Sequence, residues 1–304
     1  MIDPLAEVVT LLQPQARYSK VVYAAGSWRV RRTEAGQPFY CVILEGACTL
    51  EGAGHGAIAL EQGDFVLVPS PCGFVMSSLA PPAGAGPDAA PVRLPDGSFR
   101  LGDQDGPADV QLLVGYCAFG SPDAALLVSL LPQLVHVRGE RRLATLVQLV
   151  GEESRAARPA REVILARLLE VLLIEALRSA AGPATSPGLL RGLGDERLAV
   201  ALRRIHENLT TPWTVAQLAS EAALSRSAFF ERFSRALGVA PMQYLLSWRM
   251  AIAKGLLRRR EAGIAEVAQR IGYGSASAFS VAFARHVGMP PARYVREQTA
   301  IPEA

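Results

Sequence analysis

The C-terminal third of the chain carries one residue pattern twice, and this duplication limits the possible folds more than any other feature. Several residues of the first copy recur, identical, 50 positions later in the second, and seven of them occupy expected structural positions. They are Ser225, Phe229, Phe233, Arg235, Gly238, Pro241 and Tyr244, which recur as Ser275, Phe279, Phe283, Arg285, Gly288, Pro291 and Tyr294. An apolar stripe ahead of each set recurs at 49 positions, so a one-residue slip falls between the stripe and the set. Self-similarity at a fixed spacing indicates two copies of one supersecondary unit.

Local signals in the first copy predict two short helices joined by a tight turn. Thr214 and Gln217 have the spacing of a capping box, Ser225 is a typical N-cap, and Gly238 suits the end of a helix. This is the helix-turn-helix arrangement, whose second helix enters the major groove of DNA. Residues 242–260 predict a connecting helix of about 28 Å. Such a helix would hold two recognition helices about one turn of B-DNA apart, roughly 34 Å.

Charge is distributed unevenly along the chain. Residues 195–304 hold 15 Lys and Arg against 9 Asp and Glu, whereas residues 1–194 hold 16 against 19. The basic C-terminal part favours a nucleic-acid partner. The chain is 50% hydrophobic and 19% charged, which excludes wholesale disorder. It shows neither a signal-peptide pattern nor a membrane-spanning run, so we expect a soluble cytoplasmic protein that has no membrane partner and whose four cysteines are reduced.

The N-terminal part has the sequence pattern of a small antiparallel barrel or sandwich. A short helix is predicted over residues 3–12, and β-rich runs follow at 20–23, 28–31, 39–44, 48–50, 65–68, 74–77 and 109–119. Residues 80–107 predict a long loop with room for one brief strand. Helices are predicted over 124–134, 141–157 and 160–179. Because residues 163–174 are apolar on more than one face, these helices either pack only on their own barrel or also mediate self-association, which we favour.

Glycine and proline are concentrated in residues 181–194, which predict a linker. The expected domains are therefore residues 1–120, a helical segment at 121–180, the linker at 181–194 and a second domain at 195–304.

Two parts of the sequence resemble known families. WTVAQLASEAALSRSAFFERFSRALGVAPMQYLLSWRMAIAKGLL and IAEVAQRIGYGSASAFSVAFARHVGMPPARY resemble the AraC/XylS family of bacterial transcription regulators. PFYCVILEGACTL and LEQGDFVLVPSPCGFVM resemble the cupin-type sensor domain found in a subset of that family. The resemblance implies an α+β multidomain protein with an N-terminal cupin-like β-barrel, dimerisation helices and a C-terminal all-α tandem helix-turn-helix domain. The implied partners are double-stranded promoter DNA, a second copy of the chain, an unknown small-molecule effector and RNA polymerase.

On the first recognition helix, the face opposite the core presents Arg226, Ser227, Phe230 and Glu231. The resemblance implies that matching positions reach base edges. Phe230 suits a thymine methyl group and Glu231 a cytosine amino group, while Arg226 suits guanine or phosphate. The alternative is that Glu231 pairs with a neighbouring arginine and Phe230 belongs to an interdomain contact.

The second recognition helix presents small and mostly apolar side chains, which predict poorer direct readout. They are Ala276, Ser277, Ser280 and Val281. Arg235, Arg285 and Arg249 are placed either for phosphates or for intramolecular pairing.

The barrel region lacks the histidines that catalytic cupins use to hold a metal. Residues 39–46 contain no histidine, and Phe74 stands where a later ligand is expected, so we expect no metal, no cofactor and no enzymatic activity. The alternative is a metal-dependent cupin enzyme with an attached helical module. The candidate effector-pocket residues are Trp28, Phe39, Cys41, Cys72 and Phe74. A redox signal is a further alternative, sensed by one of Cys41, Cys48, Cys72 and Cys117.

Overall fold

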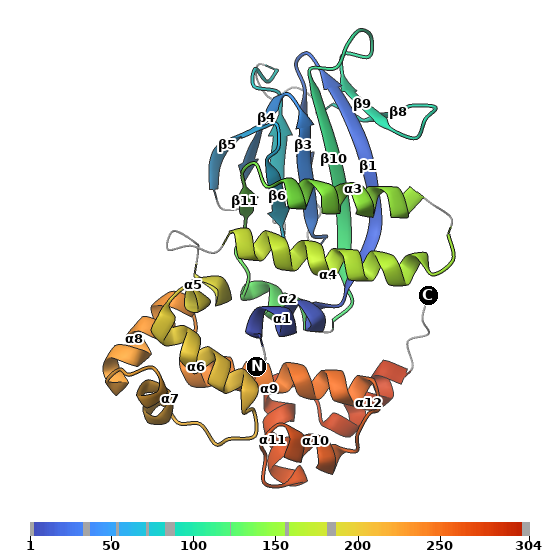
Figure 1. Ribbon diagram of the computed structural model, residues 1–304. Helices are drawn as coiled ribbons and strands as arrows, with labels where there is room; N and C mark the ends of the chain where they lie inside the picture. Colours follow the sequence, from blue (N-terminus) through green and yellow to red (C-terminus); the bar gives the residue numbers. More distant parts are fainter. Residues whose placement is uncertain are drawn as a thin grey trace. The chain divides into compact units, whose positions relative to one another are not determined.

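A computed structural model describes residues 3–32, 37–52, 55–70, 73–82, 89–121, 123–155, 158–180 and 187–299 (Figure 1). The chain forms two compact units. A β-rich unit comprises Leu12–Gly120 and Leu131–Ser186, and a helical unit comprises Met1–Leu11, Ser121–Leu130 and Pro187–Ala304. A β-rich and an all-helical unit confirm the predicted α+β multidomain fold class.

Two sheets form the β-rich unit. Their strands are β1 (Pro14–Ala25), β2 (Arg29–Arg32), β3 (Phe39–Glu45), β4 (Ala47–Gly52), β5 (His55–Glu61), β6 (Phe65–Val68), β7 (Phe74–Ser77), β8 (Val92–Arg93), β9 (Phe99–Gly102), β10 (Val110–Phe119) and β11 (Val135–Val137). One sheet has the order β11-β6-β3-β10-β1-β9-β8, and the other has the order β2-β7-β4-β5. All described pairings are antiparallel except that of β1 with β9.

The inward-facing side chains of both sheets form one apolar core. Val22, Phe39 and Leu112 come from the seven-stranded sheet, and Leu50 and Phe74 come from the four-stranded sheet. On β1, β4 and β7 these residues alternate with more exposed ones, whereas most residues of β3 and β10 are buried on both faces of the sheet. The core therefore lies between the two sheets, as expected for a small barrel.

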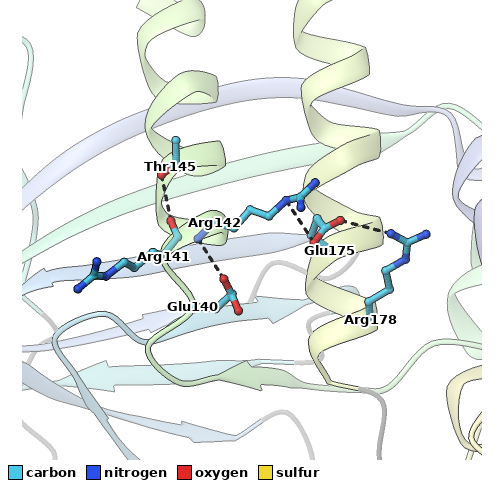
Figure 2. Close-up of polar contacts among 6 residues, drawn as sticks. All are labelled: Glu140, Arg141, Arg142, Thr145, Glu175 and Arg178. Atoms are coloured by element: carbon cyan, nitrogen blue, oxygen red, sulfur yellow. Dashed lines mark hydrogen bonds and ion pairs between the residues drawn. The ribbon is translucent and has the colours of Figure 1, made fainter.

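Two antiparallel helices, α3 (Arg141–Arg155) and α4 (Arg161–Ser179), pack across β1 and β10 of the seven-stranded sheet (Figure 1). Polar contacts also join the two helices. The Glu175 carboxylate lies 3.5 Å from Arg142 Nε on α3 and accepts a 3.4 Å hydrogen bond from Arg178 one turn further along α4 (Figure 2). One carboxylate between two guanidinium groups thus links the exposed edges of this helix pair.

The helical unit contains the remaining helices. They are α1 (Pro4–Leu12), α2 (Ala124–Ser129), α5 (Leu189–Leu193), α6 (Glu196–Glu207), α7 (Val215–Glu221), α8 (Arg226–Leu237), α9 (Pro241–Arg258), α10 (Ile264–Arg270), α11 (Ala276–Val287) and α12 (Pro291–Thr299). The predicted connecting helix corresponds to α9, whose 18 residues extend about 27 Å.

Several local expectations differ from the structure. The helix predicted over 124–134 ends at Ser129, and residues 135–137 pair with β6 as strand β11. The sequence pattern missed β5, and the predicted loop at 80–107 contains the two strands β8 and β9. The predicted linker at 181–194 contains helix α5, because Leu189 and Leu190 bury their side chains. The boundaries of the functional domains remain a prediction.

Candidate nucleic-acid interface and ligand pocket

The duplicated sequence builds the same aromatic core twice within the helical unit. Phe229 and Phe233 have ring centroids 5.4 Å apart, and so do Phe279 and Phe283. Phe233 then contacts Tyr244 at 5.8 Å, while Phe283 contacts Tyr294 at 5.5 Å. All six rings are buried. The identical residues therefore recur because each copy needs the same ring-to-ring packing between its recognition helix and the helix that follows.

The turns before α8 and α11 also match. The Leu224 amide donates to the Ala219 carbonyl at 2.9 Å, and the Tyr273 amide donates to the Ala268 carbonyl at 2.8 Å. Each turn uses one residue with a positive φ, +51° at Ala223 and +85° at the glycine of the second copy. The slip between the 49- and 50-residue spacings therefore falls after this turn.

Serine and glycine set the limits of both recognition helices. Ser225 and Ser275 are N-caps that accept hydrogen bonds from the amides three residues later. Gly238 and Gly288 end the helices in the left-handed conformation. The predicted capping box is present at Thr214, whereas the second copy begins its first helix at a glycine.

The predicted base-reading face of α8 lies on the surface. Arg226, Ser227 and Glu231 are exposed, and the Phe230 side chain is 45% exposed. Within the described part of the chain, neither Arg226 nor Glu231 forms an ion pair. The pairing considered as an alternative for Glu231 is thus not seen there. These side chains combine a cation, an anion and a ring, three chemically different groups for base edges.

The equivalent face of α11 is smaller and more apolar. Ser277 and Val281 are exposed, with Val281 at 70%, whereas Ala276 and Ser280 are half-buried. The Ser280 hydroxyl donates to the Ala276 carbonyl at 2.7 Å, so its proton is already used within the helix. Little polar recognition is available on this face.

The three arginines that were open to two interpretations separate into two groups. Arg249 donates to the carbonyls of Leu209 and Thr211 at 2.7–3.0 Å, which is intramolecular pairing. Arg235 and Arg285 are exposed and make no ion pair among the described residues. Only these two remain available to an external anion.

A polar network within the helical unit was not predicted from the sequence. The buried His206 ring contacts the Glu7 carboxylate at 2.5 Å through Nδ1 and the Tyr244 hydroxyl at 2.8 Å through Nε2. Burial and the nearby Glu7 charge raise the pKa of Tyr244. The network links α1 to α6 through Glu7 and His206, and α6 to α9 through His206 and Tyr244. No local signal could have found it, because Glu7 and His206 are 199 residues apart.

The β-rich unit contains a partly open cavity of about 40 Å³. Three predicted pocket residues, Trp28, Phe39 and Phe74, line it. Cys41 does not line the cavity and packs in the surrounding core, while Cys72 lies outside the described residues. The remaining lining residues were not predicted, and they include two cations: Lys20, Val22, Val30, Arg32, Met76, Pro91, Leu101, Leu112, Val114 and Tyr116.

The three described cysteines are buried as thiols. Burial raises the pKa of Cys48 and of Cys117 to about 12, and it raises the pKa of Cys41 as well. Oxidants react with the exposed thiolate, so neither burial nor a raised pKa suits a redox sensor at these positions.

In the described ranges, no three His, Cys, Asp or Glu side chains are grouped so that they could hold one metal ion. Among the described helices, none has both the length and the apolar character needed to cross a bilayer.

Comparisons with known proteins match both parts of the chain to protein families. The cupin family matches residues 3–182, and a helix-turn-helix domain family matches residues 218–297. A Streptomyces lividans protein described as an AraC-like transcription regulator is 36% identical, covering 98% of this chain and 99% of the relative. A Streptomyces antibioticus protein with the same description is 35% identical, covering 96% and 98%. The match to the crystal structure of ToxT from Vibrio cholerae covers 95% of this chain and 99% of the ToxT chain. Its sequence identity is 14% and its TM-score is 0.36.

Proposed function

This chain belongs to the AraC-like transcription regulators, with a cupin N-terminal domain and a helix-turn-helix DNA-binding domain, and we propose that α8 and α11 read promoter DNA unequally. In this proposal, Arg226, Ser227, Phe230 and Glu231 on α8 contact bases. Ala276, Ser277, Ser280 and Val281 on α11 make apolar or weakly polar contacts. The observation that carries the proposal is the exposed face of α8, where a cation, an anion and a ring project without internal ion pairs among the described residues.

Arg235 and Arg285 occupy the same position in the two copies, and we assign both to phosphates. Each phosphate contact releases condensed counterions, so removing one arginine weakens binding on all sequences and reduces the salt slope by about one. A base-reading residue behaves differently, because its loss changes the preferred base and leaves the salt slope nearly unchanged.

Selection of binding sites from random DNA, followed by titrations at several salt concentrations, separates these roles. Glu231→Gln and Arg226→Ala are expected to change the selected sequence. Arg235→Gln and Arg285→Gln are expected to keep the sequence and lower the salt slope. Arg293→Gln is the matched control, because Arg293 is exposed on α12 but pairs with Glu297 at 2.6 Å. An unchanged selected sequence for both α8 variants would refute the assignment of base readers.

Self-association through α4 is the second part of the proposal. The buried side of this helix consists of Leu165, Leu169, Leu172, Leu173, Ala176 and Leu177. Its other side leaves apolar residues in solvent, with Val163 63%, Ile164 42% and Val171 41% exposed. A second copy of the chain would cover this stripe and remove apolar area from water.

Sedimentation velocity tests this interface directly. Val171→Glu is expected to shift a dimer to monomer. Leu79→Glu places the same charge on a 62% exposed leucine outside α4 and should leave the dimer intact. A monomeric wild type at micromolar concentration would contradict the proposal.

The β-rich unit acts in this proposal as a sensor whose effector occupies the cavity beside Trp28, Phe39 and Phe74, and not as an enzyme. An effector that binds one arrangement of the protein more tightly than another would shift the protein toward that arrangement and so change its affinity for promoter DNA. RNA polymerase is the expected downstream partner. The site of action is the cytoplasm, where promoter DNA is found. Metal analysis of the purified protein tests the competing enzyme hypothesis, since stoichiometric iron, manganese or zinc would support it.

A further inference from the structure

Two cations face the interior of the barrel at the same cavity. Lys20 lies two residues before Val22 on β1, and Arg32 lies two residues after Val30 on β2, so each shares the inward face of its strand. All four residues line the cavity. Inward-facing charges in an otherwise apolar barrel are costly unless something compensates them.

The protein itself supplies no compensating anion among its described residues. Lys20 Nζ lies 4.3 Å from the Phe99 ring centroid, and the Arg32 guanidinium carbon lies 6.0 Å from that of Tyr116. These are cation–π contacts, which leave the positive charge in place. Among the described residues, no acidic side chain lines the cavity and neither cation has an ion-pair partner. Burial and the neighbouring Arg32 lower the pKa of Lys20, as expected for two uncompensated cations close together.

An unused hydrogen-bond donor lies in the same wall. Trp28 is 1% exposed, lines the cavity, and its indole Nε1 has no acceptor among the described residues. Buried donors normally have a partner, and one left without a partner destabilises the fold. The apolar lining includes Val22, Phe39 and Met76, whose side chains offer the indole no strong acceptor.

From these features, we infer that the cavity binds a short-chain monocarboxylate, whose anionic head faces Lys20, Arg32 and the Trp28 indole and whose hydrocarbon end faces the apolar wall. A carboxylate matches the planar guanidinium fork and accepts from the indole. The cavity is small, at about 40 Å³, so the fitting acids are short, and we expect about three or four carbons. This inference rests on the proposed sensor role of the β-rich unit, and it names the chemical class of the effector.

Calorimetric titration of the full-length protein without DNA tests the ligand class. The probes are butyrate, its neutral match butyramide, and inorganic phosphate as an anion without an apolar end. We expect saturable butyrate binding in the millimolar range or tighter, at least about tenfold weaker binding of butyramide, and no saturable phosphate binding. Lys20→Met and Arg32→Met should each weaken butyrate binding about tenfold while leaving butyramide within about twofold.

Matched variants keep the test decisive. Arg31→Met removes an exposed cation from the opposite face of β2 and should bind butyrate like wild type. Lys20→Arg retains the charge and should retain most of the affinity even if Lys20→Met proves poorly folded in a thermal melt. Equal affinity for butyrate and butyramide, no butyrate saturation below about 10 mM, or unaltered binding by both methionine variants would overturn the inference.

Adding promoter DNA separates this inference from the proposed function. If butyrate binds as expected but leaves promoter affinity unchanged, the ligand class stands and the sensor role fails. If butyrate does not bind while promoter DNA still does, the ligand class fails and the DNA-binding function stands.

Discussion

Replacing Gly272 by alanine tests the turn that both copies of the helix-turn-helix unit share. Gly272 has a φ of +85°, and a Cβ atom there would lie 2.8 Å from both Cα and the carbonyl oxygen of Thr210. It would also lie 3.0 Å from Nη2 of Arg249. The left-handed backbone costs a residue with a side chain about 1–2 kcal/mol. Forcing an extra methyl group against the Thr210 backbone costs about 1–3 kcal/mol. The expected loss of unfolding free energy is therefore about 2–5 kcal/mol.

Two further glycines separate these contributions. Gly288→Ala introduces the same left-handed conformation, with a φ of +86°, but its Cβ would meet nothing within 4 Å. The free energy of unfolding should therefore fall only by the cost of the left-handed backbone, about 1–2 kcal/mol. Gly274→Ala has neither a positive φ nor a neighbour within 4 Å, so its stability should stay within about 1 kcal/mol of wild type.

Urea unfolding followed by tryptophan emission measures the series. A Trp28→Phe background leaves Trp213 and Trp248, which both belong to the helical unit, as the only reporters. The expected order of destabilisation is Gly272→Ala first, Gly288→Ala second and Gly274→Ala last. If Gly288→Ala costs as much as Gly272→Ala, the contact with Thr210 contributes nothing and the reasoning is refuted.

Three other perturbations have expected outcomes in urea unfolding, the first two with the Trp213 and Trp248 reporters and the third in a Trp213→Phe, Trp248→Phe background that leaves Trp28 to report the β-rich unit. Thr214→Ala removes the capping-box acceptor and should lower the unfolding free energy by about 1 kcal/mol, with Thr145→Ala on α3 as a control that should not affect the helical unit. His206→Phe leaves the buried Tyr244 hydroxyl without its partner and should cost about 1–3 kcal/mol, and an unchanged urea midpoint would show that the network does not stabilise the unit. The pKa of the Cys117 thiol is raised from 9.0 to about 12, so the folded state keeps a proton that the unfolded chain loses. Its stabilising contribution is complete below pH 9 and falls by up to about 1.4 kcal/mol per pH unit toward pH 12, so Cys117→Ala should show a shallower alkaline loss of stability than wild type.

The sequence predicted the features of the DNA-binding unit that depend on local chemistry. The N-caps at Ser225 and Ser275, the C-terminal glycines and the aromatic spacing are each set within a few residues. Their duplication reinforced every signal. The exposed faces of α8 and α11 followed directly, since fixing Phe229 and Phe233 inward determines what points outward on a helix.

Features that depend on distant chain segments were not predictable in the same way. Nothing around Arg249 indicates that its guanidinium group donates to the carbonyls of Leu209 and Thr211. The signal for Lys20 was present but weak, because the alternation with Val22 and Ala24 places it on the buried face of β1. Its polarity alone suggested an exposed position. Strands β8, β9 and β11 have only two to four residues each, too few for a periodic pattern to develop, and β9 and β11 also pair with the distant strands β1 and β6.

Comparing the two copies position by position separates structural from recognition residues. Most residues that recur have an internal task, whether as ring packing, cap or turn. The arginine at 235 and 285 recurs without an ion-pair partner among the described residues, which suits an external task that does not depend on base sequence. The phosphate backbone offers such a target at successive grooves. Conversely, Arg226, Phe230 and Glu231 correspond to Ala276, Ser280 and Val281, so charged and aromatic groups occupy these positions in the first copy only. Because base edges differ along a promoter while phosphates do not, the positions that diverged between the copies are those expected to set which promoter is bound, and α8 is expected to contribute most of that discrimination.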